Sequence, residues 1–151
     1  MDRRFDFKIK NDRVVFLRDY AHHPSEIKQS VLSIRELYKD KKITAIFQPH
    51  LYTRTRDFYK DFASSLSLLD EVILVDIYPA REQPIPGVTS QLIYDNLRPG
   101  IEKCMCKKEE ILNILENKNI EVLITLGAGD IDNYVPSITE KLNTRLNKPQ
   151  S

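Results

Sequence analysis

Three histidines are the side chains best suited to acid–base chemistry in this sequence, because imidazole titrates near neutral pH. His22 and His23 lie in the segment DYAHHP (19–24), and His50 lies in QPHLYTRTR (48–56). Both segments contain a proline and follow an apolar run, so they are predicted to be loops at strand ends. Loops of this kind form the ligand sites of open α/β sheets.

The first segment is compatible with a ligand site and with a purely structural role. Asp19 follows a predicted strand, where its carboxylate can accept hydrogen bonds from a ribose diol or can cap the turn. His22 and His23 precede Pro24 at a predicted helix start, a position that favours anions. His23 can also serve as the N-cap. A metal site is disfavoured, because adjacent histidines rarely bind one ion and no further ligand has suitable spacing.

Two arginines in the second segment offer charge to an anionic ligand. Arg54 and Arg56 carry planar guanidinium groups that match the oxygens of a carboxylate or a phosphate. The alternative is a solvated basic surface at the start of the next helix, where the helix dipole disfavours cations. The mixed-charge loop 76–82 and the pair Arg3-Arg4 are interpreted, on their residue types alone, as solvated surface.

The placement of glycine excludes a P-loop from the chain. The sequence has four glycines, and none lies among the first 86 residues. A P-loop requires G-x-x-x-x-G-K-[ST], and no such run is present. Gly127-Ala128-Gly129 follows an apolar run, but Asp132 takes the place of the third glycine of a dinucleotide fingerprint. If ATP is a substrate, its main phosphate site must lie outside these 151 residues.

The elements that would position these residues alternate between strands and helices. The pattern predicts a hairpin over 5–9 and 13–17, in which apolar and charged residues alternate. Buried strands are predicted at 43–47, 71–77 and 121–126, with a further short strand at 102–106 that contains Cys104 and Cys106. Helices are predicted at 24–37, 58–69, 89–97, 109–115 and 131–146, with Pro136 in the first turns of the last one or kinking it.

This alternation predicts an α/β fold, with a Rossmann-like, mostly parallel sheet, helices on both faces and an antiparallel hairpin at the N-terminal end. The length of 151 residues fits one domain. We expect that domain to span residues 1–146, with a frayed tail at 147–151.

Composition narrows the functional classes. Lys and Arg number 23 against 22 Asp and Glu, a net charge of +1, which argues against a nucleic-acid partner. No apolar run approaches the roughly 20 residues of a membrane span, so no membrane insertion is expected. The two cysteines, one residue apart, are interpreted as reduced thiols of a cytoplasmic protein.

Four strings, DYAHHPSEI, FQPHLYTRTRDF, DIYPAREQPIPGVTS and LGAGDI, occur in this order and spacing. Together they resemble the C-terminal domain of the Mur ligases of peptidoglycan synthesis, over nearly the whole chain. Within that family the strings are most similar to the branch that joins L-alanine to UDP-N-acetylmuramate. The resemblance implies that the N-terminal UDP-binding domain and the central ATPase domain are not in this chain, which fits the glycine inventory.

The resemblance also implies roles for individual residues. Asp19 matches the aspartate expected on the ATP ribose, and Arg4 matches a hinge arginine expected near the phosphates. Tyr20 and His22 match residues that line the nucleotide and alanine sites, and Arg54 matches an arginine expected on the alanine carboxylate. Positions that line the site without a specific role are implied for His23, His50, Arg56, Gly127, Gly129 and Asp130.

The implied reaction is ATP-dependent amide formation. The sugar carboxylate takes the γ-phosphate of ATP to form an acyl phosphate, and the amine of L-alanine then displaces phosphate. His22 is the candidate base for the amine. ATP is a substrate, Mg²⁺ belongs to the full-length enzyme with no ligand from this chain, and the isolated chain is expected to be inactive.

Two residues depart from the family pattern. Arg18 precedes Asp19 where the family usually has a second aspartate, and Leu51 stands where some members have an arginine. Arg18 either points away from the ligand, since strand neighbours alternate sides, or alters the nucleotide contacts. Two alternatives remain: the related ligase that attaches a peptide to the same sugar, which the run QPHLYTRTRDF fits less well, and a stand-alone nucleotide-binding module.

Overall fold

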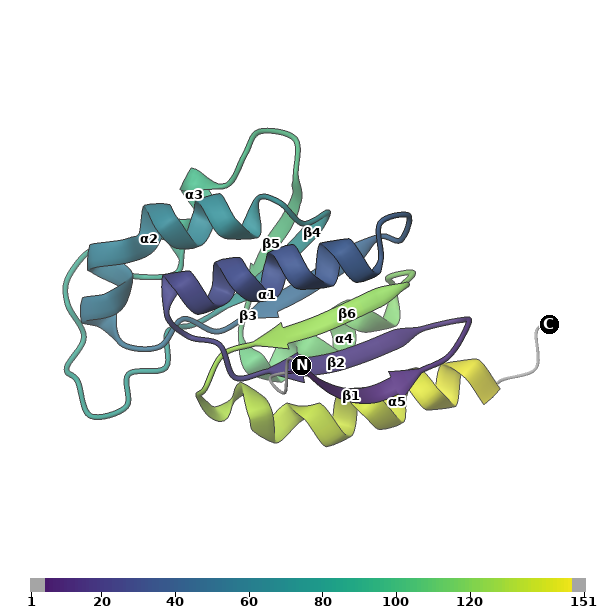
Figure 1. Cartoon of the computed structure of the whole chain (residues 1–151). Helices are drawn as coiled ribbons and strands as arrows, with labels where there is room; N and C mark the ends of the chain where they lie inside the picture. The colour runs from purple at the N-terminus through teal and green to yellow at the C-terminus, as the bar shows by residue number, and fades with distance from the viewer. Residues whose placement is uncertain (1–4, 148–151) are drawn as a thin grey trace.

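A computed structural model of the chain describes residues 5–147, with side chains described through residue 144. Six strands form one sheet in the order β1-β2-β6-β3-β4-β5 (Figure 1). β1 runs antiparallel to β2, and every other neighbouring pair is parallel. The strands are β1 (Asp6–Lys10), β2 (Val15–Asp19), β3 (Ile43–Phe47), β4 (Glu71–Val75), β5 (Glu102–Cys106) and β6 (Val122–Leu126).

Helices cover both faces of this sheet. The α-helices are α1 (Pro24–Leu37), α2 (Tyr52–Leu66), α3 (Gln91–Asn96), α4 (Ile111–Glu116) and α5 (Val135–Asn147), and the 3-10 helices are η1 (Lys108–Glu110) and η2 (Asp130–Tyr134). α1, α2 and α3 lie on one face, and α4 and α5 lie on the other (Figure 1). Each face therefore has its own apolar cluster.

The central strands explain why the sheet needs both layers. All five residues of β3, β4 and β6 are buried, as expected for strands that are covered on both faces. Phe47 of β3 packs against Phe62 of α2 with ring centroids 5.2 Å apart, in the cluster beneath α1 and α2. Ile46 points into the opposite cluster, with Ile138 of α5. Each such side chain contributes about 1.5–3 kcal/mol when fully buried.

The strand order brings the carboxyl ends of three neighbouring strands, β2, β6 and β3, to one edge of the sheet. β2 leads into α1 and β3 leads into α2, on the same face of the sheet. β6 lies between β2 and β3 but leads through η2 into α5 on the other face. The connections therefore diverge around β6, and open α/β sheets bind their ligands at such a point.

The fold class predicted from the sequence is confirmed, including the hairpin and the two helical layers. Pro136 lies in the first turn of α5. Some boundaries were wrong: α2 begins at Tyr52 and ends at Leu66, and β4 ends at Val75. Asn147 belongs to α5, and the rest of the predicted tail, like Arg4, lies outside the described residues.

Candidate functional site

The carboxylate of Asp19 closes the turn that follows β2. Its side chain is 1% exposed, and Oδ1 accepts a hydrogen bond from the backbone N–H of Ala21 at 2.9 Å. The hydroxyl of Ser30, on α1, donates to Oδ2. The structure thus shows the capping role that the sequence left open, and the ribose contact of Asp19 stays a prediction.

The N-terminus of α1 is capped from within the chain. Pro24 occupies the first turn, and Glu26 reaches back to accept from the backbone N–H groups of His22, at 3.2 Å, and His23, at 3.0 Å. Burial alone would raise the pKa of Glu26, but these N–H groups, with the two imidazoles, lower it. His23 is the N-cap residue, as one of the two alternatives for it predicted.

The hydrogen bond of His22 assigns its tautomer. Nδ1 of His22 lies 2.9 Å from the carbonyl oxygen of Tyr20. A carbonyl oxygen can only accept, so Nδ1 carries the proton and Nε2 of the neutral ring keeps a free lone pair. His22 can therefore accept a proton through Nε2.

The structure brings the three histidines together. The ring centroid of His22 lies 5.0 Å from that of His23 and 5.6 Å from that of His50. The ring of His50 lies 5.4 Å from that of Tyr78, which follows β4. Two backbone hydrogen bonds of 2.8 Å, Leu51 N–H to Tyr78 O and Tyr78 N–H to Pro49 O, tie the two loops to each other.

Arg54 places a positive charge close to His50 in this cluster. Nη1 of Arg54 and Nδ1 of His50 are buried and have no hydrogen-bond partner among the described residues. Burial lowers the pKa of His50, and the charges of Arg54 and His22 lower it further. A ligand carboxylate would satisfy both nitrogens, because it accepts hydrogen bonds and offsets the local positive charge.

Glu82 fixes the start of α2, and sequence reasoning missed it. Its carboxylate accepts from the backbone N–H of Tyr52, at 2.6 Å, and of Thr53, at 3.1 Å, and from the hydroxyl of Thr53. The hydrogen bond from that hydroxyl lowers the pKa of Glu82 most, and the backbone bonds add to it. The cap comes from a loop about 30 residues away, so no local signal marked it. It places Arg54 in the first turn of α2.

Gln48 is the second residue that sequence reasoning missed. Its side chain is 1% exposed; Nε2 donates to Asp130 Oδ1 at 2.6 Å, and Oε1 accepts from the N–H of Ile131 at 3.0 Å. A Cβ at Gly129 would lie 2.5 Å from Gln48 Oε1 and 2.6 Å from Cγ of Tyr78. Gln48 therefore locks the loop after β6 onto the end of β3. Its position in QPH, next to His50, was the available signal.

The other predicted site-lining residues make contacts outside the histidine cluster. Arg56 is exposed and pairs with its neighbour Asp57 at 2.9 Å, outside the imidazole cluster. Gly127 is buried with φ +138°, and its N–H donates to the carbonyl oxygen of Asp19. Asp130 forms an ion pair with Lys108 in addition to its contact with Gln48. The site-lining roles of these residues stay predictions.

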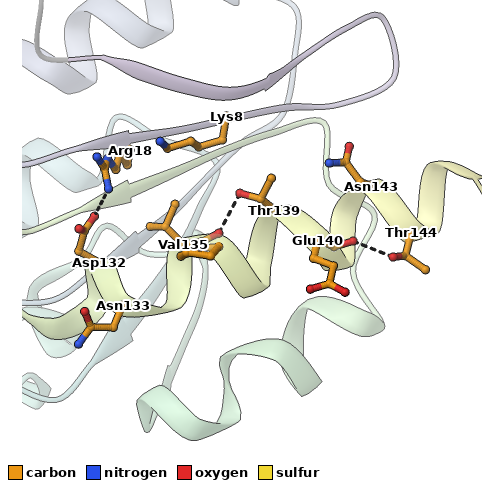
Figure 2. Close-up of a pocket in the computed structure, with 10 residues that line it drawn as sticks. Lys8, Arg18, Asp132, Asn133, Val135, Thr139, Glu140, Asn143 and Thr144 are labelled. Carbon is orange, nitrogen blue, oxygen red and sulfur yellow. Dashed lines mark hydrogen bonds and ion pairs between the residues drawn. The ribbon is translucent and has the colours of Figure 1, made fainter.

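A cavity of about 640 Å³ adjoins the turn after β2. Its lining residues are Phe5, Asp6, Asp19, Tyr20, Ala21, His22 and Glu26. A second, open groove of about 830 Å³ lies between the β1–β2 hairpin and α5, where Arg18 and Asp132 meet (Figure 2).

The described residues contain neither a ready metal site nor a membrane-spanning helix. No group of three or more His, Cys, Asp or Glu side chains among them is arranged to hold a metal ion. No helix in the described part of the chain is long and apolar enough to cross a membrane.

Comparison with known proteins identifies the family. The profile of the family described as "Mur ligase, glutamate ligase domain" matches residues 3–130. UDP-N-acetylmuramate–L-alanine ligase of Phocaeicola vulgatus is 83% identical over 145 residues, which cover 96% of this chain and 32% of that protein.

Solved structures show the same relationship. The crystal structure of UDP-N-acetylmuramate-alanine ligase MurC from Thermotoga maritima superposes with a TM-score of 0.75 at 26% identity, covering 95% of this chain and 30% of that one. A murein peptide ligase from Psychrobacter arcticus has a TM-score of 0.74 at 16% identity over 99% of this chain and 31% of that one, which shows a likeness of fold alone. The chain spans about a third of the length of these proteins, and it belongs to the Mur ligase, glutamate ligase domain family.

Proposed function

We propose that the chain, over residues 1–146, is the C-terminal domain of a cytoplasmic, ATP-dependent ligase that joins L-alanine to UDP-N-acetylmuramate. Membership of the Mur ligase family supports this assignment, and so does the 83% identity to a relative named for that reaction. The free thiols of Cys104 and Cys106 are consistent with a reducing compartment.

The observation that carries the proposal is the pair of buried, unpartnered nitrogens on Arg54 and His50. Together they form a subsite for one carboxylate, and the incoming amino acid supplies it. Because Arg54 lies in the first turn of α2, which Glu82 fixes, its guanidinium is held ready for the carboxylate before binding. This arrangement stands without an arginine at Leu51.

His22 receives a proton from the incoming amine. The amine of L-alanine must be neutral to attack a carbonyl carbon, and Nε2 of His22 is the available acceptor once Tyr20 fixes the tautomer. The imidazole lies beside His50 at 5.6 Å between ring centroids, so the base lies next to the carboxylate subsite.

The nucleotide occupies the cavity beside Asp19 and Tyr20. Asp19 and Tyr20 line this cavity, and a carboxylate is a suitable acceptor for a ribose hydroxyl. Arg4, outside the described residues, acts on the phosphates. The Mg²⁺ that ATP brings would be held by the remainder of the ligase, because no group of three or more potential metal ligands lies among the described residues of this chain.

In this scheme the chain contributes position and charge. The sugar carboxylate takes the γ-phosphate of ATP, and the acyl phosphate that forms reacts with the amine, releasing phosphate. Closing this domain over the other two would exclude water and align the amine with the acyl carbon.

A chimeric enzyme tests the proposal. The full 151-residue chain would replace the matching third of the Phocaeicola vulgatus ligase, and phosphate release would be followed with ATP, UDP-N-acetylmuramate and L-alanine. We expect alanine-dependent turnover, and Arg54→Gln should raise KM for L-alanine at least about ten-fold, because a charged hydrogen bond to the carboxylate is lost.

The matched control is Arg13→Gln, which changes an exposed arginine in the turn before β2. This variant should leave KM for L-alanine and KM for ATP unchanged. Absence of alanine-dependent turnover, or turnover only with the tripeptide accepted by murein peptide ligases, would contradict the proposal. An unchanged KM for L-alanine in Arg54→Gln would contradict the carboxylate subsite.

A further inference from the structure

Arg18 contacts three separate parts of the molecule: strand β1, the 3-10 helix η2 and the turn after β2. Its Nε lies 2.9 Å from Asp6 Oδ2 on β1, and its Nη1 donates to Asp132 Oδ1 on η2 at 2.8 Å. Its guanidinium carbon lies 4.9 Å from the centroid of the Tyr20 ring. Figure 2 shows the side chain reaching from β2 toward η2, in the groove beside α5.

Two of these three partners line the cavity assigned to the nucleotide. Asp6 and Tyr20 both belong to its wall, whereas Arg18 does not and lines the neighbouring groove. Arg18 therefore lies outside the nucleotide cavity and contacts two of the residues that line it. Its contacts can influence a bound nucleotide through Asp6 and Tyr20.

We propose that Arg18 is a positioning residue for nucleotide binding, which anchors Tyr20 and Asp6 to η2 and so fixes one wall of the nucleotide cavity. The inference rests on the proposed function, because the cavity is assigned to ATP there.

Tyr20 needs such an anchor. Its side chain is 47% exposed and lies in the turn after β2, where no core packing selects one rotamer. A cation over one face of the ring holds the ring in place and leaves the other face to the ligand. Asp132 and Asp6 in turn hold the guanidinium from two sides, so the arginine is itself fixed.

The contacts favour arginine over lysine. The guanidinium donates a hydrogen bond through Nη1 to Asp132, forms an ion pair with Asp6 that involves no hydrogen bond from Nε, and places its central carbon 4.9 Å from the centroid of the Tyr20 ring. An ammonium group has no planar face and no rigid fork, so lysine cannot hold all three partners together.

The test uses the chimeric ligase with Arg18→Lys and Arg18→Gln. We expect each variant to raise KM for ATP about five-fold and to leave kcat and KM for L-alanine within about two-fold. Arg13→Gln, on the same hairpin but at the far end of β2, is the matched control and should change neither KM.

A double-mutant cycle separates positioning from general stability. If Arg18 acts through Tyr20, Arg18→Gln and Tyr20→Leu together should raise KM for ATP no more than the larger single effect. The inference would be overturned if the double variant raised KM for ATP by the product of the two single effects, or if the Arg18 variants left KM for ATP unchanged. It would also be overturned if the variants raised KM for ATP and KM for L-alanine equally and lowered the melting temperature.

A second measurement needs no ligase activity. ATP titration of the 151-residue chain, followed by NMR at the Tyr20 ring, should give a Kd about five-fold higher for Arg18→Lys than for the parent. Equal Kd values would overturn the inference. A chimera that lacks alanine-dependent turnover while the titration shows this difference would count against the ligase assignment and would support the role of Arg18.

Discussion

Gly129, in the loop after β6, leaves no room for a side chain. A methyl group there would lie within 2.6 Å of Gln48 Oε1 and of the Tyr78 ring, both of which are held by their own contacts. Gly129→Ala should therefore lower the free energy of unfolding by about 1–3 kcal/mol, as other overpacking substitutions do.

Urea denaturation of the 151-residue chain measures this effect. Ala128→Ser, at the exposed neighbouring position, is the control and should stay within about 0.5 kcal/mol of the parent. A Gly129→Ala variant as stable as the parent would show that Gln48 and Tyr78 move aside at little cost. The conclusion that Gln48 holds the loop after β6 in place would then be wrong.

Sequence reasoning selected candidate site residues by the chemistry of their side chains. His22 was selected as a base, Arg54 as a carboxylate ligand and His50 as a site-lining residue; the structure places the rings of His22 and His50 5.6 Å apart, and the roles stay predictions. Gln48 and Glu82 were missed, because the sequence around a neutral amide or a loop carboxylate does not indicate which distant groups it will contact. Their partners are separated from them by 82 and 30 residues, so only the fold reveals the contacts.

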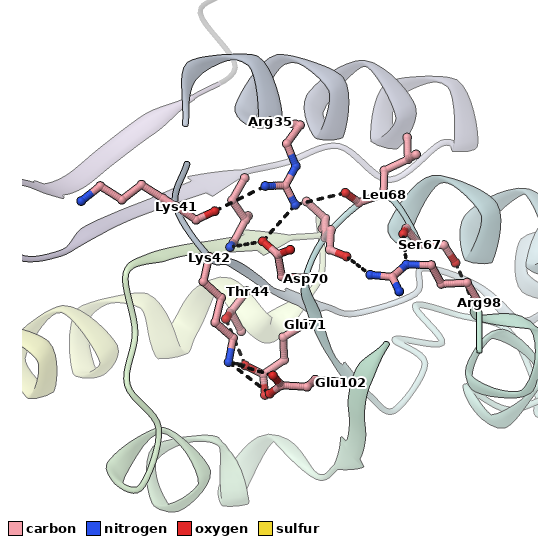
Figure 3. Close-up of polar contacts among 12 residues, drawn as sticks. Arg35, Lys41, Lys42, Thr44, Ser67, Leu68, Asp70, Glu71, Arg98 and Glu102 are labelled. Atoms are coloured by element: carbon pink, nitrogen blue, oxygen red, sulfur yellow. Dashed lines mark hydrogen bonds and ion pairs between the residues drawn. The ribbon is translucent and has the colours of Figure 1, made fainter. Parts of the chain in front are cut away.

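Asp70 joins β3 and α1 at the end of the sheet where β3 begins, opposite the carboxyl ends of the parallel strands. Its Oδ2 accepts from the backbone N–H of Ile43, at the start of β3, and from Arg35 on α1 at 2.9 Å (Figure 3). Burial alone would raise the pKa of Asp70, but the Ile43 N–H and Arg35 together lower it below its ordinary value of 3.8. Asp70 is therefore more stable as a carboxylate in the folded chain than in the unfolded one.

The sign of the pH dependence follows from that lowered pKa. The contribution of Asp70 is present above pH 3.8 and is lost as the pH falls through the lower folded value. Asp70→Asn should reduce stability at neutral pH by no more than about 1 kcal/mol, because the pair is partly exposed. The difference from the parent should shrink as the pH drops below about 4.

Urea midpoints at a series of pH values measure this dependence. Asp61→Asn, on the exposed surface of α2, serves as the control and should track the parent at every pH. A difference between Asp70→Asn and the parent that grows toward acid pH would contradict the assignment.

Some elements were predictable from the local pattern. The strand at 43–47, whose five residues are all buried, and the strand at 102–106, in which the two cysteines alternate around Met105 and only Cys106 is buried, were predicted with the bounds that the structure shows. The start of α2 was placed too late: Leu51 precedes it with φ +75°, and the cap comes from Glu82, which no local rule anticipates. Tertiary contacts therefore set the boundary that places Arg54.

At the scale of the whole molecule, the chain should fold alone and not ligate. Two apolar clusters fill both faces of the sheet, so the core does not depend on another domain. The 151 residues contain no P-loop, so ATP, L-alanine and UDP-N-acetylmuramate added to the pure chain should release no phosphate above background.

The same sample distinguishes a domain from a self-sufficient module. Steady phosphate release would contradict the domain assignment. Nucleotide binding at micromolar Kd would instead favour the stand-alone nucleotide-binding module, because a closing domain alone offers only part of the ATP contact surface. A folded chain with neither property is the expected result.

The position of β6 also governs how the polypeptide is made. β6 is the last strand to leave the ribosome, yet it lies between β2 and β3 and pairs with both. Until residue 126 emerges, the nascent chain holds two unsatisfied strand edges, the kind of edge that pairs with other chains. Completion of the sheet therefore requires the insertion of β6 between two strands made earlier, and the most aggregation-prone form of this domain is the one that still lacks β6.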